Sequence, residues 1–258
     1  MDLLEHPDAQ PFRALFGAGT TLHPLHGPCF VCEGRLLVQE ALAAHRAGHL
    51  IVRSVLGTPG ALATLDLPEG IPALAASAEA ISGLANFTFN RGLLCAVSVP
   101  PPPDPGALTK AQRLLVLPRV DQVDNLGLLL RSAAALGMEG VLLGRGPGAF
   151  DRRTVRVSMG AAWRLPVWRS ETPETLLEAW RSAGGEVVGA ALAPGALDAR
   201  RWIPAPRTAL VLGPEGEGLE QAWLERCDLL AQIPMARGMD SLNVAAAGAI
   251  LMWRLSMI

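Results

Sequence analysis

The sequence predicts an α/β protein with two domains, and three features of the chain support this. Apolar runs of strand length alternate with amphipathic helical patterns along most of the 258 residues. Residues 100–106, which read PPPPDPG, interrupt the alternation. A proline run can neither join a sheet ladder nor continue a helix, so this segment is predicted to be a semi-rigid linker. The third feature is that the apolar runs near the end of the chain stop abruptly at loop-like residues. We therefore expect a smaller α/β domain at 1–99 and a larger one at 107–258.

The composition permits a large core but gives no strong electrostatic field. Half of the residues are hydrophobic and 18% are charged, with a net charge of −2. Residues 1–106 hold five Lys/Arg against nine Asp/Glu, and residues 107–258 hold 17 against 15, which gives −4 and +2. Any RNA contact would therefore depend on a local basic patch. No apolar run approaches the roughly 20 residues that span a bilayer, and the acidic start is unlike a signal peptide. We expect a cytoplasmic protein with no membrane partner.

In the first domain the alternation begins at residue 30. Residues 1–25 have a helical and then an irregular pattern. The strands expected here are 30–34, 49–57, 71–74 and 93–99, and the helices are 36–48, 59–65 and 78–85.

The second domain alternates as regularly. The expected strands are 114–117, 140–143, 166–169, 186–192, 209–212 and 229–233. The expected helices are 125–136, 152–165, 173–185, a short one from Leu219 and a terminal one from Ser241. Near-continuous apolar strands separated by helices predict a mostly parallel sheet with helices on both faces.

Two loops in this domain are predicted to form one pocket. Strand 209–212 is followed by GPEGEG at 213–218, and strand 229–233 is followed by PMARGMDS at 234–241. In an open α/β sheet, ligands lie just beyond the carboxyl ends of the strands. The GPEGEG loop has neither the G-x-G-x-x-G order of a dinucleotide fold nor the Lys-Ser/Thr of a triphosphate loop. Its bare backbone and Glu215 could receive a flat ligand, or its glycines could serve a tight turn at positive φ.

Other polar residues each have an ordinary structural explanation. Ser241 would cap the terminal helix and Asn243 would lie in its first turn. Asn125 would cap helix 125–136, and Arg131 lies off the apolar stripe of that helix. The cysteines at 29 and 32 have CxxC spacing, but no second pair follows, so we expect small apolar strand residues and no metal site.

Taken together, three motifs resemble those of a known family. The ordered set Asn125-x5-Arg131, then LGPEGEGL, then IPM followed by SLNVAAAGAI is similar to the signature motifs of the SpoU (TrmH-like) branch of the SPOUT RNA methyltransferases. The resemblance covers residues 114–255. In the first domain, FVCEGRLLVQEAL and NRGLLCAV resemble a small RNA-binding domain that is related to certain ribosomal proteins.

The resemblance implies a reaction, a cofactor and a fold. Members of this family transfer a methyl group from S-adenosylmethionine to a ribose 2′-hydroxyl of RNA, and their catalytic domain is a homodimer with a deep trefoil knot. By motif, the cofactor residues would be Leu212, Gly213, Ile233, Met235, Leu242 and Asn243. The catalytic or substrate residues would be Asn125, Arg131, Glu215, Ser241 and Asn243. Arg131 would act as a base or, since arginine normally stays protonated, as an orienting or phosphate-binding group.

The RNA target is open at this stage. The 2′-hydroxyl marks the substrate as RNA, and the separate first domain favours ribosomal over transfer RNA. The densest basic cluster, Arg152, Arg153 and Arg156, would contact RNA phosphates or form a solvated helix face. A non-catalytic RNA-binding or assembly factor that keeps the fold is the alternative from another class.

Overall fold

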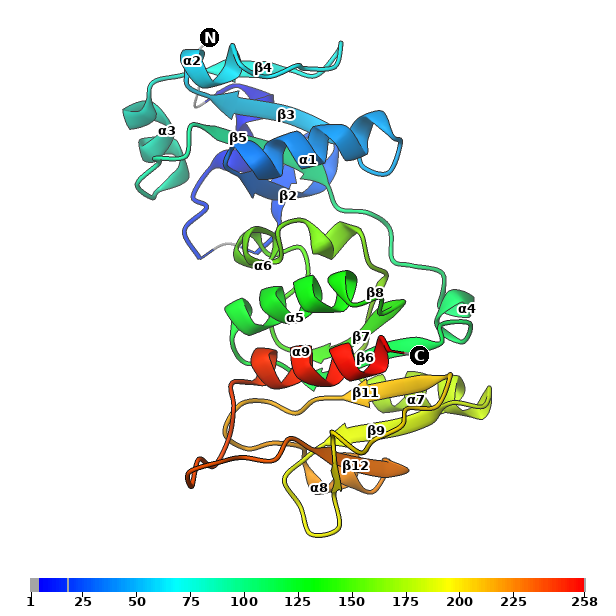
Figure 1. The fold of residues 1–258 in the computed structure, drawn as a ribbon. Coiled ribbons are helices and arrows are strands. Elements are labelled where there is room, and N and C mark those ends of the chain that lie inside the picture. Colours follow the sequence, from blue (N-terminus) through cyan, green and yellow to red (C-terminus); the bar gives the residue numbers. More distant parts are fainter. Residues whose placement is uncertain (1–4, 18, 258) are drawn as a thin grey trace. The chain divides into compact units, whose positions relative to one another are not determined.

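The computed structural model describes residues 5–17 and 19–257 and contains two compact units (Figure 1). Unit 1 consists of the chain up to Pro101 together with Gly148–Gly160, and unit 2 consists of Pro102–Pro147 and Ala161–Ile258. The division after Pro101 falls inside the proline run. The segment Gly148–Gly160 follows the linker in sequence but groups with unit 1, which the sequence pattern does not indicate.

Unit 1 is a mixed sheet of five strands with short helices around it. The sheet order is β1-β2-β5-β3-β4, and all neighbours are antiparallel except β3 and β4. The strands are β1 (Thr21–His23), β2 (Gly27–Glu33), β3 (Val52–Gly57), β4 (Ala73–Ala75) and β5 (Leu93–Ser98). The helices are the 3₁₀ helix η1 (Pro7–Phe12), α1 (Arg35–Arg46), α2 (Pro59–Leu62), α3 (Ala78–Ala85) and α6 (Arg152–Ser158).

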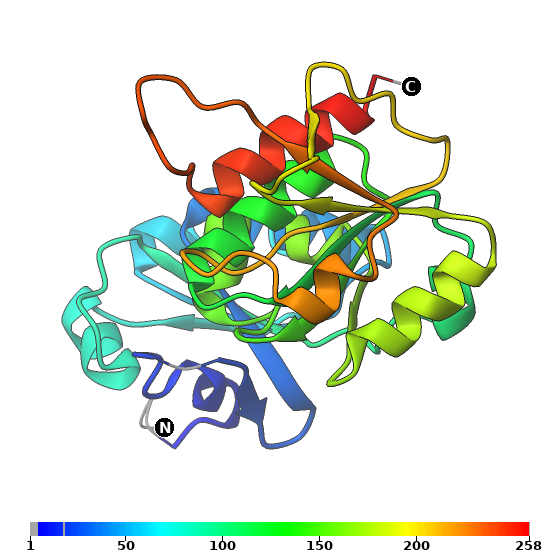
Figure 2. The same ribbon diagram turned by 90° about the horizontal axis from the view of Figure 1, so that it is seen from below.

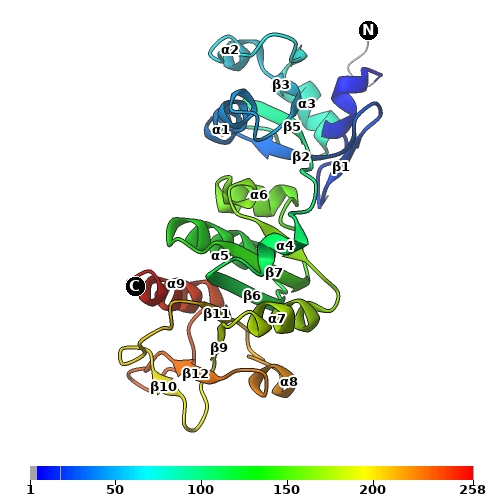
Figure 3. The same ribbon diagram turned by 90° about the vertical axis from the view of Figure 1, so that its right-hand side faces the viewer.

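The two faces of this sheet bury different side chains. Successive strand residues point to opposite faces, so each strand contributes side chains to the packing on both faces of the sheet. On one face, Phe12 of η1 and Ile81 of α3 pack with Val31 and Leu56 of the sheet. Helix α1 buries an apolar stripe that includes Leu42, and Figure 3 shows α1 and α3 on opposite sides of the sheet.

The cysteine pair of the CxxC spacing lies in a strand. Cys29 and Cys32 belong to β2, and Cys32 is opposite Cys95 of β5. All three are buried and reduced, and burial raises the pKa of the Cys32 and Cys95 thiols. They are therefore small core residues, as the sequence predicts. Within 5–17 and 19–257, no group of three or more His, Cys, Asp or Glu side chains is placed to hold a metal ion.

Unit 2 is a parallel sheet of seven strands in the order β10-β12-β9-β11-β6-β7-β8. The strands are β6 (Arg113–Arg119), β7 (Gly140–Arg145), β8 (Val167–Arg169), β9 (Glu186–Ala190), β10 (Leu197–Asp198), β11 (Thr208–Val211) and β12 (Leu229–Gln232). The helices are α4 (Pro105–Leu108), α5 (Val123–Ala135), the 3₁₀ helix η2 (Ala161–Trp163), α7 (Pro173–Ser182), α8 (Gln221–Leu224) and α9 (Val244–Leu255).

Helices cover both faces of this sheet, as the sequence predicts. Helices α5 and α9 lie side by side on one face, and α7 and α8 lie on the other (Figures 2 and 3). Trp180 of α7 and Trp223 of α8 fill the core of the second face. Gly248 lets α9 approach closely, because a Cβ there would stand 2.6 Å from Leu129 Cδ2 of α5 and 2.8 Å from Leu212 Cδ1.

Several helix limits differ from the sequence prediction, and three of the differences concern predicted site residues. Helix α5 begins at Val123, so Asn125 lies in its first turn and is buried rather than being the N-cap. The expected helix 152–165 breaks after Ser158, because Met159 adopts a left-handed conformation with φ of 52°. Helix α9 begins at Val244 rather than Ser241, and Asn243 is its N-cap: the side chain accepts hydrogen bonds from the amides of Ala245 and Ala246.

The sequence pattern also failed to predict three short elements. Strand β10 has two residues, too few for a periodic pattern, and α4 is a single turn that begins inside the proline run at Pro105. At the start of the chain, β1 occupies part of the stretch expected to be irregular.

The path of the last segment is consistent with the knot implied by the resemblance. Strand β12 lies beyond β9, near the edge of the sheet, and the chain then returns to α9, which packs against α5 and contacts β11. Knots are exceptions to the usual rule against threaded chains, so no local pattern could predict one. No helix in the part of the chain that is described has both the length and the apolar character needed to cross a membrane.

Candidate active site

The loops that follow β11 and β12 line one cavity of about 910 Å³ in unit 2. This volume lies within the range of small-molecule and cofactor pockets. The sequence predicted such a shared pocket from the positions of the two loops. The apolar lining includes side chains from the loops after β11 and β12 and from α9: Leu212, Leu219, Ile233, Met235, Leu242 and Leu251.

Glycine at 213 is required by the turn that closes this pocket. A Cβ at Gly213 would lie 2.3 Å from the backbone carbon of Gly218 and 2.5 Å from the amide nitrogen of Leu219. Those atoms belong to the same loop, so they could not move without opening it. Gly216 and Gly218 also have positive φ, at 79° and 71°. The loop therefore presents backbone rather than side chains to the cavity.

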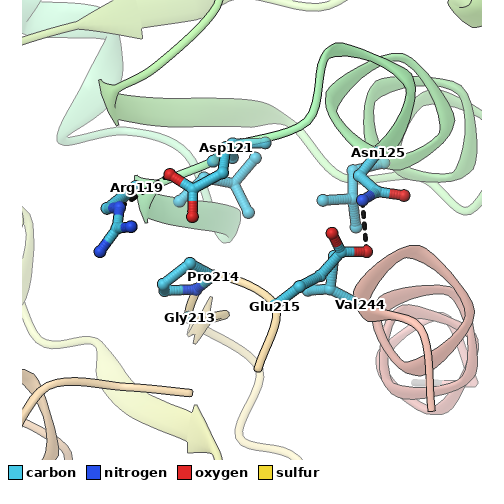
Figure 4. A pocket seen from close by; sticks show the side chains of 10 residues that line it. Arg119, Asp121, Asn125, Gly213, Pro214, Glu215 and Val244 are labelled. Atoms are coloured by element: carbon cyan, nitrogen blue, oxygen red, sulfur yellow. Dashed lines mark hydrogen bonds and ion pairs between the residues drawn. The ribbon is translucent and has the colours of Figure 1, made fainter. Parts of the chain in front are cut away.

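Glu215 is held by two asparagines from distant parts of the chain, of which Figure 4 shows Asn125. Its Oε1 accepts hydrogen bonds from Asn125 Nδ2 and, at 2.8 Å, from Asn243 Nδ2. Asn243 Nδ2 also donates to Asn125 Oδ1 at 3.1 Å. Because Asn243 Oδ1 caps α9, its amide group is oriented with Nδ2 toward the carboxylate. The network thus joins α5, the β11 loop and the start of α9.

The second carboxylate oxygen of Glu215 is a buried acceptor. Oε2 is inaccessible to solvent and has no hydrogen-bond partner among residues 5–17 and 19–257. Glu215 lines the large cavity and also a small neighbouring hollow of about 10 Å³. A buried carboxylate oxygen without a donor is costly, so a donor from a ligand or from water is expected there.

Arg119 ties the same loop to the end of β6. Its Nε donates to Asp121 Oδ1 at 2.8 Å, and its Nη1 donates to Glu217 Oε2 at 2.8 Å. These hydrogen bonds, the one to Asp121 first, raise the pKa of Arg119. Sequence reasoning missed Arg119 because nothing in its neighbourhood marks it. The available signal was its position at the carboxyl end of an apolar strand.

The structure brings most of the predicted cofactor and catalytic residues to the cavity. Its lining includes the whole predicted cofactor set, Leu212, Gly213, Ile233, Met235, Leu242 and Asn243, together with Glu215 and Ser241. Asn125 joins through the network and lines the small hollow. Gln122 and Asp240 also line the cavity and were not predicted.

Arg131 is not among the residues that line either cavity. It lies on α5 with an exposed side chain and forms no hydrogen bond or ion pair with the described residues. It therefore does not reach the Glu215 network of its own chain.

The predicted basic cluster lies in unit 1, where it is largely engaged. Arg152 Nη1 donates to Glu33 Oε2 at 2.7 Å, and its guanidinium lies 4.5 Å from the ring centre of Phe87. Arg156 is 3.5 Å from the same carboxylate oxygen, and Arg153 is exposed on α6. Arg152 is thus part of a structural ion pair.

Comparison with known proteins agrees with this fold. The model of the SpoU rRNA Methylase family matches residues 112–253. The 23S rRNA (guanosine(2553)-2′-O)-methyltransferase RlmP of Bacillus subtilis is 32% identical over 88% of this chain and 88% of its own length. The uncharacterized tRNA/rRNA methyltransferase Rv0881 of Mycobacterium tuberculosis is 36% identical over 85% of this chain and 78% of its own length.

Solved structures show the same architecture. The AdoMet-bound rRNA methyltransferase from Sinorhizobium meliloti superposes with a TM-score of 0.71 at 27% identity and covers 88% of this chain and 86% of its own. The SpoU methyltransferase AviRb from Streptomyces viridochromogenes gives 0.74 at 26% identity, with 96% and 95% covered. The family model and these relatives place the chain among the RNA methyltransferases. Within that class, it belongs to the SpoU rRNA methylase family.

Proposed function

We propose that the protein transfers a methyl group from S-adenosylmethionine to a ribose 2′-hydroxyl of ribosomal RNA. The observation that supports this best is the cavity between the β11 and β12 loops, with the Glu215 network at its edge. Two of the similar proteins are named as 2′-O-methyltransferases, one of them acting on 23S rRNA.

The residues around the cavity fit S-adenosylmethionine. The adenine ring would require a flat apolar slot with nearby backbone groups, and Leu212, Ile233 and Leu242 with the bare 213–218 loop supply these features. The buried Oε2 of Glu215 offers an acceptor for a hydroxyl or ammonium group. The volume of about 910 Å³ leaves room for part of the RNA beside the cofactor.

The bound cofactor would supply a methyl group that is already strongly electrophilic. The chain must then hold the ribose oxygen in line with that methyl group and receive the 2′-hydroxyl proton. The 2′-hydroxyl proton would pass to water or to a basic group at the edge of the pocket. The main task of the protein is to position the ribose. The hydrogen-bonded Asn125–Glu215–Asn243 network lies at the edge of the pocket and supplies fixed polar groups for this task.

We propose further that two chains form a homodimer and that Arg131 serves the pocket of the partner. Helices α5 and α9 expose Leu128, Ile250 and Trp253, whose side chains are 42%, 42% and 54% accessible. Arg131 lies one turn after Leu128 on α5 and does not line the pocket of its own chain. Pairing of two such faces would bury the apolar residues and would bring Arg131 to the pocket of the partner chain.

The test is transfer of labelled methyl from S-adenosylmethionine to unmodified RNA, with the products separated by size. We expect label in ribosomal RNA, and label in transfer RNA alone would instead support the second candidate substrate. Arg131→Ala should abolish transfer with little change in cofactor affinity by calorimetry, whereas Arg200→Ala, at another exposed arginine of unit 2, should not. Cofactor binding without transfer to any RNA would favour a non-catalytic RNA-binding factor.

A further inference from the structure

Unit 1 contains a second cavity whose lining is strongly basic. Its volume is about 390 Å³, and its lining includes Glu33, Gly34, Arg35, Arg91 and Arg156. All of these residues belong to unit 1. The reaction proposed above does not use this cavity.

The one carboxylate at this cavity cannot neutralise the arginines around it. Glu33 is buried, with Arg152 Nη1 at 2.7 Å and Arg156 Nη1 at 3.5 Å from Oε2, and Arg91 Nε at 3.3 Å from Oε1. Three guanidinium groups therefore share one negative charge. Arg35 lines the cavity with Arg91 and Arg156, and it has no hydrogen bond or ion pair with any described residue. Arginine is the side chain best suited to bind phosphate oxygens in pairs.

The backbone adds to this positive potential. Helix α1 begins at the cavity, and its N-cap, Gly34, has no side chain to accept from the first-turn amides. These amides belong to Arg35, Leu36 and Leu37, which also line the cavity. The partial positive charge of a helix N-terminus favours an anion. The cavity thus combines space, an unpaired arginine and two partly exposed arginines, with the helix end as a supporting feature.

We propose that this cavity binds a backbone phosphate of the RNA substrate. This inference rests on the proposed function, because the phosphodiester is the anion that an RNA methyltransferase meets in its substrate. Unit 1 is close to neutral, with eight Lys/Arg against nine Asp/Glu over residues 1–101 and 148–160, so a confined basic cavity is the means by which it can hold a polyanion. Arg35 and Arg91 would make the contacts, while Glu33 and Arg152 hold the wall in place.

The experiment measures binding of an unmodified ribosomal RNA transcript to the full chain over a range of salt concentrations. Arg35→Gln combined with Arg91→Gln should weaken binding and lower the slope of log K against log[salt] by about 1 for each contact removed. Arg46→Gln, at the opposite end of α1, removes one positive charge away from the cavity and should leave the slope unchanged. Unchanged affinity and slope in the double variant would overturn the proposal.

A second arm identifies the source of the phosphate. Inorganic phosphate should shift the NMR signals of the Arg35–Leu37 amides, and the transcript should displace it. If phosphate binds there and RNA does not compete, the cavity serves a free anion and the RNA assignment is wrong. Methyl transfer measured on the same transcript separates the two claims. Loss of RNA affinity in the variant, with no transfer by the wild type, would support the cavity and contradict the proposed reaction.

Discussion

Replacing Glu215 by alanine removes the acceptor at the centre of the pocket network. Asn125 is only 4% exposed, so its Nδ2 would lose the carboxylate at a position that solvent reaches poorly. An unsatisfied buried donor costs about 1–3 kcal/mol. Asn243 is exposed, so water replaces the lost partner at little cost. We therefore expect Glu215→Ala to lower the free energy of unfolding by about 1–3 kcal/mol, nearly all of it through Asn125.

Glu215→Gln separates this structural role from the chemical one. The glutamine carbonyl can still accept from both asparagines, which places its NH₂ group where the free Oε2 lies. Stability should then stay closer to that of the wild type, while a ligand donor would meet a donor instead of an acceptor. Methyl transfer should fall strongly.

The assay pairs urea unfolding with methyl-transfer rates, and Glu217→Ala is the matched control. Glu217 belongs to the same loop but is 65% exposed, so its solvent-screened ion pair with Arg119 should contribute little to stability. If Glu215→Ala unfolds at the same urea concentration as the wild type, the network does not stabilise the fold. If Glu215→Gln keeps full activity, the free oxygen has no role in the reaction.

Three further outcomes follow. Gly213→Ala should weaken S-adenosylmethionine binding in calorimetry, because its methyl group overlaps backbone atoms of Gly218; unchanged affinity would show that the loop can rearrange. Asn243→Asp keeps a cap for α9 but places a second carboxylate beside Glu215, so it should lower the stability of the protein at pH 7. Stability should partly recover as the pH falls and the pair of carboxylates takes up a proton. Equal urea midpoints at pH 7 and pH 5 would refute this. Burial raises the pKa of Cys32 and Cys95 above the ordinary value of 9.0, so at high pH the unfolded chain releases thiol protons that the folded chain keeps. The stability of unit 1 should therefore fall as the pH rises above about 9. Replacing both cysteines by alanine should reduce this dependence of the free energy of unfolding on pH, as measured by urea titrations.

Local patterns were sufficient to predict the layers of the fold. The strands of unit 2 are continuous apolar runs that end in glycine or polar loops, so their order along the chain and the mostly parallel sheet could be predicted and are confirmed. The pocket followed from the same reasoning, because loops at the carboxyl ends of parallel strands meet at one edge. Helix ends were less accurate: both Ser241 and Asn243 are good caps, and only the structure shows that Asn243 is the one used.

Contacts between distant parts of the chain could not be predicted in this way. Asn125 and Glu215 are 90 positions apart, and Asn125 and Asn243 are 118 apart, so no periodicity links them. The resemblance to the family placed these residues in one region, but it gave no information on which oxygen of Glu215 is held and which is free. The grouping of Arg152 and Arg156 with Glu33 likewise depends on how Gly148–Gly160 packs in unit 1.

The most direct test of the proposed reaction is the chemical position of the transferred methyl group. RNA labelled by the wild-type protein would be digested to nucleosides, and each labelled nucleoside would be fragmented by mass spectrometry to separate base from sugar. We expect the added methyl mass on the ribose fragment, and resistance of the adjoining phosphodiester to alkaline cleavage. A methyl group on the base fragment, with the linkage still cleaved by alkali, would contradict the proposed 2′-O transfer.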